Sequence, residues 1–136
     1  MVERAQFEQY VSDAIDNIPE ELQGSVQNIA FKVEEFPSQE QRVKLGLRPY
    51  SALFGLYEGV PLTHRNGVKP VLPDVITVFM HPMIEMFLDE KTLKKQIFNT
   101  VWHEVAHYFG FNHEQIHATE SRVNQDTDHH GHVEQE

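Results

Sequence analysis

Hydrophobic and polar positions follow two different periods in the first third of the chain. In residues 2–18, apolar side chains recur every three or four positions, which predicts a helix with one buried face, and Pro19 ends it. In residues 26–36, apolar and polar side chains roughly alternate as far as Pro37, which is typical of a half-buried strand. Residues 39–47 fit one or two helical turns. This part of the chain therefore predicts a helix followed by a strand.

Two further apolar runs predict two more strands. Residues 53–62 have the composition of a strand that contains glycines at positions 55 and 59. The pair Asn66-Gly67, with prolines at positions 70 and 73, marks a loop after it. Residues 75–80, with the sequence VITVFM, form a continuous apolar run that a proline soon follows. A run of this kind suits a strand nearer the centre of a sheet than the other two.

The longest predicted helix covers residues 90–109. Asp89 can cap its first turn, and Gly110 stands where helices commonly end. Residues 114–124 have the pattern of another short helix. Residues 125–136 are polar and lack an apolar period, so we expect a disordered tail there.

The length and the order of these elements predict one domain of the α+β class. A chain of 136 residues with 40% hydrophobic content can bury one modest core. We predict a single domain over residues 1–124, with a separate polar, histidine-rich tail over residues 125–136. Its small mixed sheet of about three to four strands is expected to pack with the N-terminal helix and the long helix at 90–109.

Charge and composition exclude several classes of function. The formal net charge is −10 and the basic residues are scattered, so we expect no nucleic-acid partner. The chain has no cysteine, which leaves only histidine and carboxylate side chains to hold a metal ion. The N-terminal segment does not resemble a signal peptide, and no apolar run reaches the length of a membrane span. We therefore expect a cytoplasmic protein without a membrane partner.

Two histidines on the long helix are spaced to meet one metal ion. His103 and His107 are four residues apart, so their side chains lie on one face of a helix, one turn apart. A continuous polar stripe on this helix consists of Gln96, Asn99, Thr100, His103, Glu104 and His107. Apolar residues cover much of the remaining surface, so we expect the stripe to face away from the core. Histidines at this spacing also arise by chance on the polar face of an amphipathic helix.

Three more residues narrow the interpretation to metal-dependent hydrolysis. Glu104 follows the first histidine, where a carboxylate lies beside a metal-bound water without occupying a ligand position. Gly110 allows the chain to turn back and bring His113 to a third ligand position. Three neutral imidazoles leave a fourth position for water, whose pKa zinc lowers to about 7. We predict one Zn²⁺ ion held by His103, His107 and His113, with Glu104 as the general base.

These five residues fill every fixed place of the metzincin signature HExxHxxGxxH, but no methionine follows the motif to form the methionine turn of that group. The chain more closely resembles a family of short bacterial zincin-like metallopeptidases, over most of residues 3–117. The resemblance includes LFGLYEGVPLTHR at residues 53–65 and VITVFMHPM at residues 75–83. That family commonly has an acidic residue where His113 stands. The resemblance implies a minimal zincin fold and hydrolysis of a peptide or protein substrate by a zinc metallopeptidase.

Several other side chains have weaker claims to a role. Tyr57 and Glu58 are expected to line a substrate cleft if their strand lies beside the metal, although Tyr57 equally suits a core and Glu58 a solvated position. His117 is either a substitute ligand or a hydrogen-bond partner of a ligand. His64 and His81 are expected at the surface, and the tail histidines are expected to bind metal only adventitiously.

Two alternatives from other functional classes remain open at this point. A bacterial family of metal-dependent single-strand endoribonucleases uses three histidines at the same spacing, but there a glycine usually follows the first histidine, where this chain has Glu104. The negative charge of the chain also disfavours RNA. The other alternative is a non-catalytic, zinc-stabilised binding module that keeps the metal site without turnover.

Overall fold

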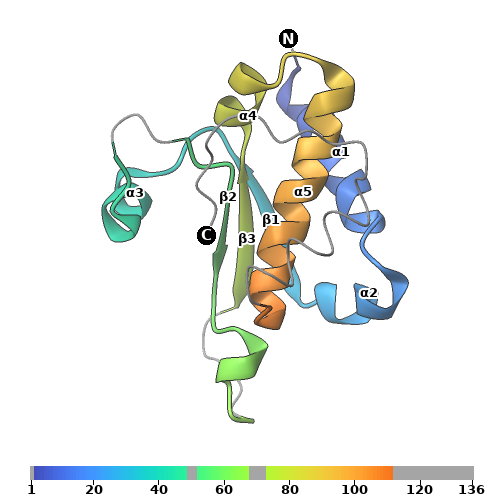
Figure 1. Ribbon diagram of the computed structural model, residues 1–136, viewed down its shortest axis with the longest axis vertical. Helices are drawn as coiled ribbons and strands as arrows, with labels where there is room; N and C mark the ends of the chain where they lie inside the picture. Colours follow the sequence, from blue (N-terminus) through green and yellow to red (C-terminus); the bar gives the residue numbers. More distant parts are fainter. Residues whose placement is uncertain (1, 49–51, 68–72, 112–136) are drawn as a thin grey trace.

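Three strands form a mixed sheet whose centre is the apolar run near residue 76 (Figure 1). The computed structural model describes residues 2–48, 52–67 and 73–111. β1 (Ile29–Glu34) runs parallel to β3 (Asp74–Phe79), and β2 (Gly55–Glu58) runs antiparallel to β3 on its other side. The prediction of a more central third strand is confirmed. In the described part of the chain, β1 and β2 are the two edges of the sheet.

Two long helices cover one face of the sheet, and a short helix lies on the other face (Figure 1). α1 (Arg4–Asp16) packs against α5 (Glu90–Phe109), which in turn contacts β2 and β3. The core between them contains Ile76 and Val78 of β3, which are fully buried. On the opposite face, α3 (Gln39–Leu45) packs by its C-terminal end against a second, smaller apolar cluster. The predicted α+β class, with a small mixed sheet, an N-terminal helix and a long helix, is confirmed.

The first predicted strand begins too early. Val26 ends α2 (Glu20–Val26), a short helix that the apolar pattern did not predict, and the strand begins only at Ile29. Both side chains are buried in the core. They are three positions apart, a separation that places two side chains on one helical face. The apparent alternation therefore joined the end of a helix to the start of a strand.

The structure also shortens the second strand and adds a helix after the third. β2 covers only Gly55–Glu58 of the predicted range 53–62, and the 3-10 helix η1 (Leu62–His64) begins at the last residue of that range. α4 (Met80–Met86) begins directly after β3, although the sequence predicted Met80 as the last residue of that strand. Pro82 lies in the first turn of α4, where a missing N–H does not break a helical hydrogen bond.

Both predicted ends of α5 are confirmed. The side chain of Asp89 accepts a hydrogen bond of 2.9 Å from the backbone N–H of Thr92. Gly110 has a left-handed backbone with φ of 81°. The backbone N–H of Gly110 donates to His107, and that of Phe111 donates to Ala106, which is the paired arrangement that closes many helices. These two local signals fix where the helix that carries the motif begins and ends.

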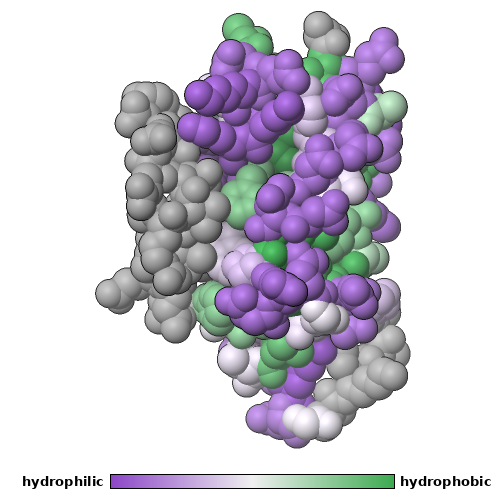
Figure 2. Space-filling view, turned by 90° about the vertical axis from the view of Figure 1, so that its right-hand side faces the viewer, coloured by the Kyte–Doolittle hydropathy of each residue, from purple (hydrophilic) through white to green (hydrophobic). Residues whose placement is uncertain are grey.

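The side of the molecule that lies to the right in Figure 1 is mainly hydrophilic, with hydrophobic side chains in small, separate patches (Figure 2). Among the described residues, none of the helices combines the length and the apolar character that a membrane span requires. The helix predicted over residues 114–124 and the tail predicted over residues 125–136 lie outside the described residues. The domain boundaries therefore stay a prediction.

Candidate metal centre

The two histidines of the motif lie close enough to share an ion. His103 and His107 project from the C-terminal half of α5, and their Nε2 atoms are 3.1 Å apart. Their rings are in edge contact, with centroids 4.8 Å apart. Two nitrogen ligands at about 2.0–2.1 Å from a tetrahedral zinc ion lie about 3.3 Å apart. The observed separation therefore fits two ligands of one zinc ion.

A carboxylate completes this cluster. One ligand atom from each of His103, Glu104 and His107 lies within 4.8 Å of the others. The histidines are half-buried, whereas Glu104 is fully buried. Removing a carboxylate from water is costly unless cations or hydrogen-bond donors surround it, and a divalent ion at the histidines would contribute such a charge. The donor set of imidazole and carboxylate, without thiolate, is one that zinc accepts.

The burial of Glu104 corrects one expectation from the sequence. The polar stripe of α5 was expected to face away from the core, but Thr100 and Glu104 are completely buried. α5 approaches β2 closely at Gly55, where an added Cβ would lie 2.6 Å from Thr100 Cγ2 and 3.2 Å from Glu104 Cγ. These two residues of the stripe therefore pack against the edge strand β2. A glycine within a predicted strand was the available signal, because it often marks such a close approach.

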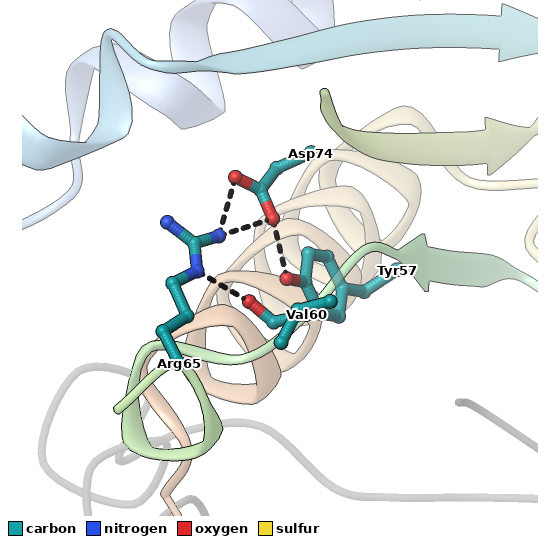
Figure 3. A network of polar contacts seen from close by, with 4 residues as sticks. All are labelled: Tyr57, Val60, Arg65 and Asp74. Atoms are coloured by element: carbon teal, nitrogen blue, oxygen red, sulfur yellow. Dashed lines mark hydrogen bonds and ion pairs between the residues drawn. The ribbon is translucent and has the colours of Figure 1, made fainter. Parts of the chain in front are cut away.

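A second polar group lies near the C-terminal end of α5 (Figure 3). Arg65 Nη2 donates to both carboxylate oxygens of Asp74, at 2.7 and 2.6 Å, and the Tyr57 hydroxyl donates to one of them at 2.6 Å. Arg65 Nε donates to the carbonyl oxygen of Val60 at 2.7 Å. Asp74 is buried at the first position of β3. Three segments of the chain therefore meet at one carboxylate.

The electrostatics of this group keep Tyr57 neutral. Burial, and then the hydrogen bond to the negatively charged Asp74, raise the pKa of the Tyr57 hydroxyl well above its usual value. Its hydroxyl therefore remains a hydrogen-bond donor at neutral pH and does not act as a base. The hydrogen bond to Asp74 likewise raises the pKa of Arg65, which stays positively charged.

The two residues predicted to line a cleft lie on opposite faces of the sheet. Tyr57 is on the α5 side, and its ring is in edge contact with that of Tyr108, with ring centroids 6.0 Å apart. Glu58, the next residue, points to the other face and accepts a hydrogen bond of 3.3 Å from Gln41 of α3. There it lines a groove of about 880 Å³ between the sheet and α3. The structure thus brings Tyr57, but not Glu58, to the face of the sheet that carries the motif.

The remaining histidines divide into surface positions and positions outside the described residues. His64 is exposed in η1, as expected. His81 is partly exposed and stacks on Phe36, with ring centroids 4.8 Å apart. The proposed third ligand His113, His117 and the tail histidines lie outside the described residues. Their roles stay predictions.

Arg65 and Asp74 received no role from the sequence. Arg65 ended a segment quoted for its resemblance to a family, and Asp74 marked only the start of a strand. Their partnership depends on how the loop after β2 folds back onto β3, which no local pattern reveals.

A three-stranded mixed sheet, with a long helix that carries two histidines and a glutamate at metal-binding distances, is the arrangement expected of a zincin-like protein. A family model described as zincin-like metallopeptidase matches residues 26–123, more than two thirds of the chain. The chain therefore belongs to the zincin-like metallopeptidase family, which confirms the resemblance found in the sequence. No curated protein matches it. The matched range includes β1 to α5 but not α1.

Proposed function

We propose that the protein is a zinc-dependent metallopeptidase in which His103 and His107 are metal ligands and Glu104 is the general base. The observation that supports this most directly is the 3.1 Å separation of the two Nε2 atoms beside a buried carboxylate. When bound, a zinc ion supplies a Lewis acid and acidifies water. Glu104 would take a proton from the attacking water and later deliver it to the leaving amine. Its position next to His103 on the helix keeps it close to that water.

A third protein ligand is needed to complete such a site, and we propose His113. Gly110 ends α5 in a left-handed conformation three residues before it, so the chain can leave the helix axis there. His117 is the alternative donor. Both assignments rest on the sequence, as does the predicted location in the cytoplasm.

The edge of the sheet offers a place for an extended peptide. In the described part of the chain, β2 pairs only with β3, so the backbone N–H and C=O groups along its other edge can pair with an added strand. α5 passes β2 at Gly55, beside Glu104. A peptide that added to this edge as a further strand would run past the general base, held mainly by backbone hydrogen bonds. We therefore propose a peptide or an unfolded segment of a protein as the substrate.

Metal analysis of the purified chain tests the site. Wild type should hold about one zinc ion per chain, and His103→Ala and His107→Ala should each lose it, because three or four ligands are needed for tight binding. His81→Ala removes a partly exposed histidine of α4, outside the motif, and is the matched control, so it should keep the ion. Stoichiometric zinc in His103→Ala would contradict the assignment.

Hydrolysis of a mixed peptide library tests the reaction. Glu104→Gln should keep zinc and lose about 10²- to 10⁴-fold in rate, which is the usual contribution of a general base. Equal cleavage by wild type and Glu104→Gln would refute the role of Glu104. Cleavage of single-stranded RNA and not of peptides would favour the endoribonuclease, and bound zinc without either activity would favour the binding module.

A further inference from the structure

The loop between β2 and β3 lies against the last turn of α5. Residues 59–65 of this loop include η1, whose Thr63 touches the end of the helix. A Cβ added to Gly110 would lie only 2.3 Å from Thr63 Oγ1. The guanidinium of Arg65 lies over the ring of Tyr108, 5.5 Å from its centroid. The loop therefore contacts positions 108 and 110, immediately after His107.

Arg65 connects this loop to the central strand. It binds Asp74 at the start of β3 through both carboxylate oxygens and binds Val60 within its own loop. Its side chain is only 17% exposed and that of Asp74 only 7%, so the pair is largely screened from water. Nη2 donates to Asp74 and Nε donates to Val60, so two nitrogens of the planar guanidinium are held in different directions. Through Arg65, the first residue of the central strand β3 therefore holds the loop in place.

The end of a helix needs such support more than its middle. The last carbonyl groups of a helix have no partner within it, and terminal turns open readily. His107 lies in this last turn, and its carbonyl accepts the N–H of Gly110. Opening of the turn would move its ring away from His103. Residues that orient metal ligands commonly affect metal affinity as much as they affect activity.

We infer that Arg65 is a positioning residue for His107, holding the loop over residues 59–65 against the last turn of α5 so that His107 Nε2 stays beside His103 Nε2. The inference rests on the proposed function for its purpose, because it assumes that these two atoms share a metal ion. Tyr57 assists Arg65 by donating to the same carboxylate of Asp74. Neither Arg65 nor Tyr57 needs to touch substrate for this role.

Two variants of Arg65 and two controls test the inference. Arg65→Met removes the charge and the three hydrogen bonds to Asp74 and Val60 but keeps much of the length of the side chain. Arg65→Lys keeps the charge but loses the planar group whose Nη2 and Nε donate to Asp74 and to Val60. Arg42→Met is the matched control, since Arg42 also donates to a backbone carbonyl but belongs to α3. Val11→Ala removes volume from the core between α1 and α5 and reports a loss of stability alone.

The first measurement is amide hydrogen exchange in metal-free protein. Arg65→Met should speed exchange at the amides of Gly110 and Phe111, which close the helix, by at least about 10-fold relative to the amide of Val101 in mid-helix. Arg42→Met should leave this ratio unchanged. Val11→Ala lowers global stability without touching the loop, so it should speed exchange at Val101 at least as much as at Gly110 and Phe111 and should not raise this ratio. An unchanged ratio in Arg65→Met would overturn the inference whatever happens to metal binding.

The second measurement is zinc affinity by competition with a chelator. Arg65→Met should bind zinc about 10- to 100-fold more weakly than wild type, Arg65→Lys should lie between them, and both controls should match wild type. Wild-type affinity in Arg65→Met, combined with a lower Tm, would show a merely structural role and overturn the inference. If the proposed function is wrong, wild type will bind no zinc or will bind it without cleaving peptides. In that case the exchange ratio still decides whether Arg65 holds the end of the helix.

Discussion

A single methyl group added at Gly55 should disturb the candidate site without touching any proposed ligand. The added Cβ would lie 2.6 Å from Thr100 Cγ2, 3.2 Å from Glu104 Cγ and 3.5 Å from the carbonyl oxygen of Thr77. Carbon atoms in ordinary contact are about 3.5–4.0 Å apart, so the first contact is about 1 Å too short. Thr100 is completely buried, so the second χ1 rotamer that a threonine can adopt in a helix has no open space to enter. Since its methyl group cannot easily rotate away, α5 and β2 must separate.

The size of the effect follows from this displacement. Inserting a methyl group into a close-packed interior costs about 1–3 kcal/mol, and a domain of this length loses roughly 3–5 °C in Tm for each kcal/mol. A misplacement of about 1 Å in a reacting group can reduce the rate about 100-fold. We therefore expect Gly55→Ala to lower Tm measurably and to lower kcat on peptides by about two orders of magnitude.

The matched control is the same substitution at Gly24. This glycine lies inside α2, and nothing lies within 4 Å of its added Cβ. Alanine is favoured over glycine within a helix by about 0.5–1 kcal/mol, so Gly24→Ala should raise Tm slightly and leave peptide cleavage unchanged. Thermal melts of both variants give the change in Tm, and steady-state kinetics on peptides give the change in kcat. If Gly55→Ala melts and cleaves like wild type, the close approach of α5 to β2 does not hold Glu104 in place.

Three further outcomes test other parts of the structure. Gly110→Ala combines a strained left-handed alanine with a clash against Thr63, so it should cost about 1–3 kcal/mol in a denaturant melt and weaken zinc binding. Asp89→Ala should lower Tm at neutral pH, because the hydrogen bonds from Thr92 hold the pKa of Asp89 below its unfolded value of 3.8. The stabilisation by Asp89 is present above pH 3.8 and is lost as the pH falls through the lower pKa of the folded state. The Tm values of wild type and Asp89→Ala should therefore converge in strong acid. A difference in Tm that stays constant with pH would contradict the capping role. Zinc at about 100 times its Kd should stabilise the wild type by about 2.7 kcal/mol relative to chelator-treated protein, and equal melts would argue against a folded-state metal site.

The elements that sequence predicted most accurately are those with local end signals. α5 begins after Asp89 and ends before Gly110 because each residue satisfies backbone groups within its own turn. β3 was recognisable because a continuous apolar run suits a strand buried on both faces. In contrast, Val26 belongs to a helix and α4 continues directly from β3, although the apolar pattern fitted strands there. At such junctions both secondary structures bury the same side chain, so hydrophobicity alone does not separate them.

In the candidate site, too, the features set by local sequence were predicted and those set by distant contacts were not. The spacing of His103 and His107 needs only the pitch of a helix, so the sequence predicts their proximity, whichever surface they face. The direction of Glu104 depends on which neighbour α5 packs against. The polar residues of the stripe predicted a face exposed to solvent. Because Gly55 has no side chain, β2 instead lies close enough to cover Thr100 and Glu104. That outcome is tertiary, because it depends on a contact between residues 49 positions apart.

Two residues far from the motif in the sequence lie against the helix that carries the candidate metal site. The motif lies near the end of its helix, where backbone hydrogen bonding is weakest, and two segments after β1 contact this half of α5. Gly55 sets how closely β2 covers Glu104, while Arg65 ties the following loop to Asp74 beside the last helical turn. Substitutions at these two positions should therefore both weaken the site. Gly55 lies against Thr100 and Glu104, and Arg65 lies over Tyr108, which is on the same face of α5 one turn further on, so the two substitutions should not act independently. The free energy of unfolding that the double variant loses should therefore differ from the sum of the two single losses by more than about 0.5 kcal/mol, and additive losses in denaturant melts would contradict this coupling.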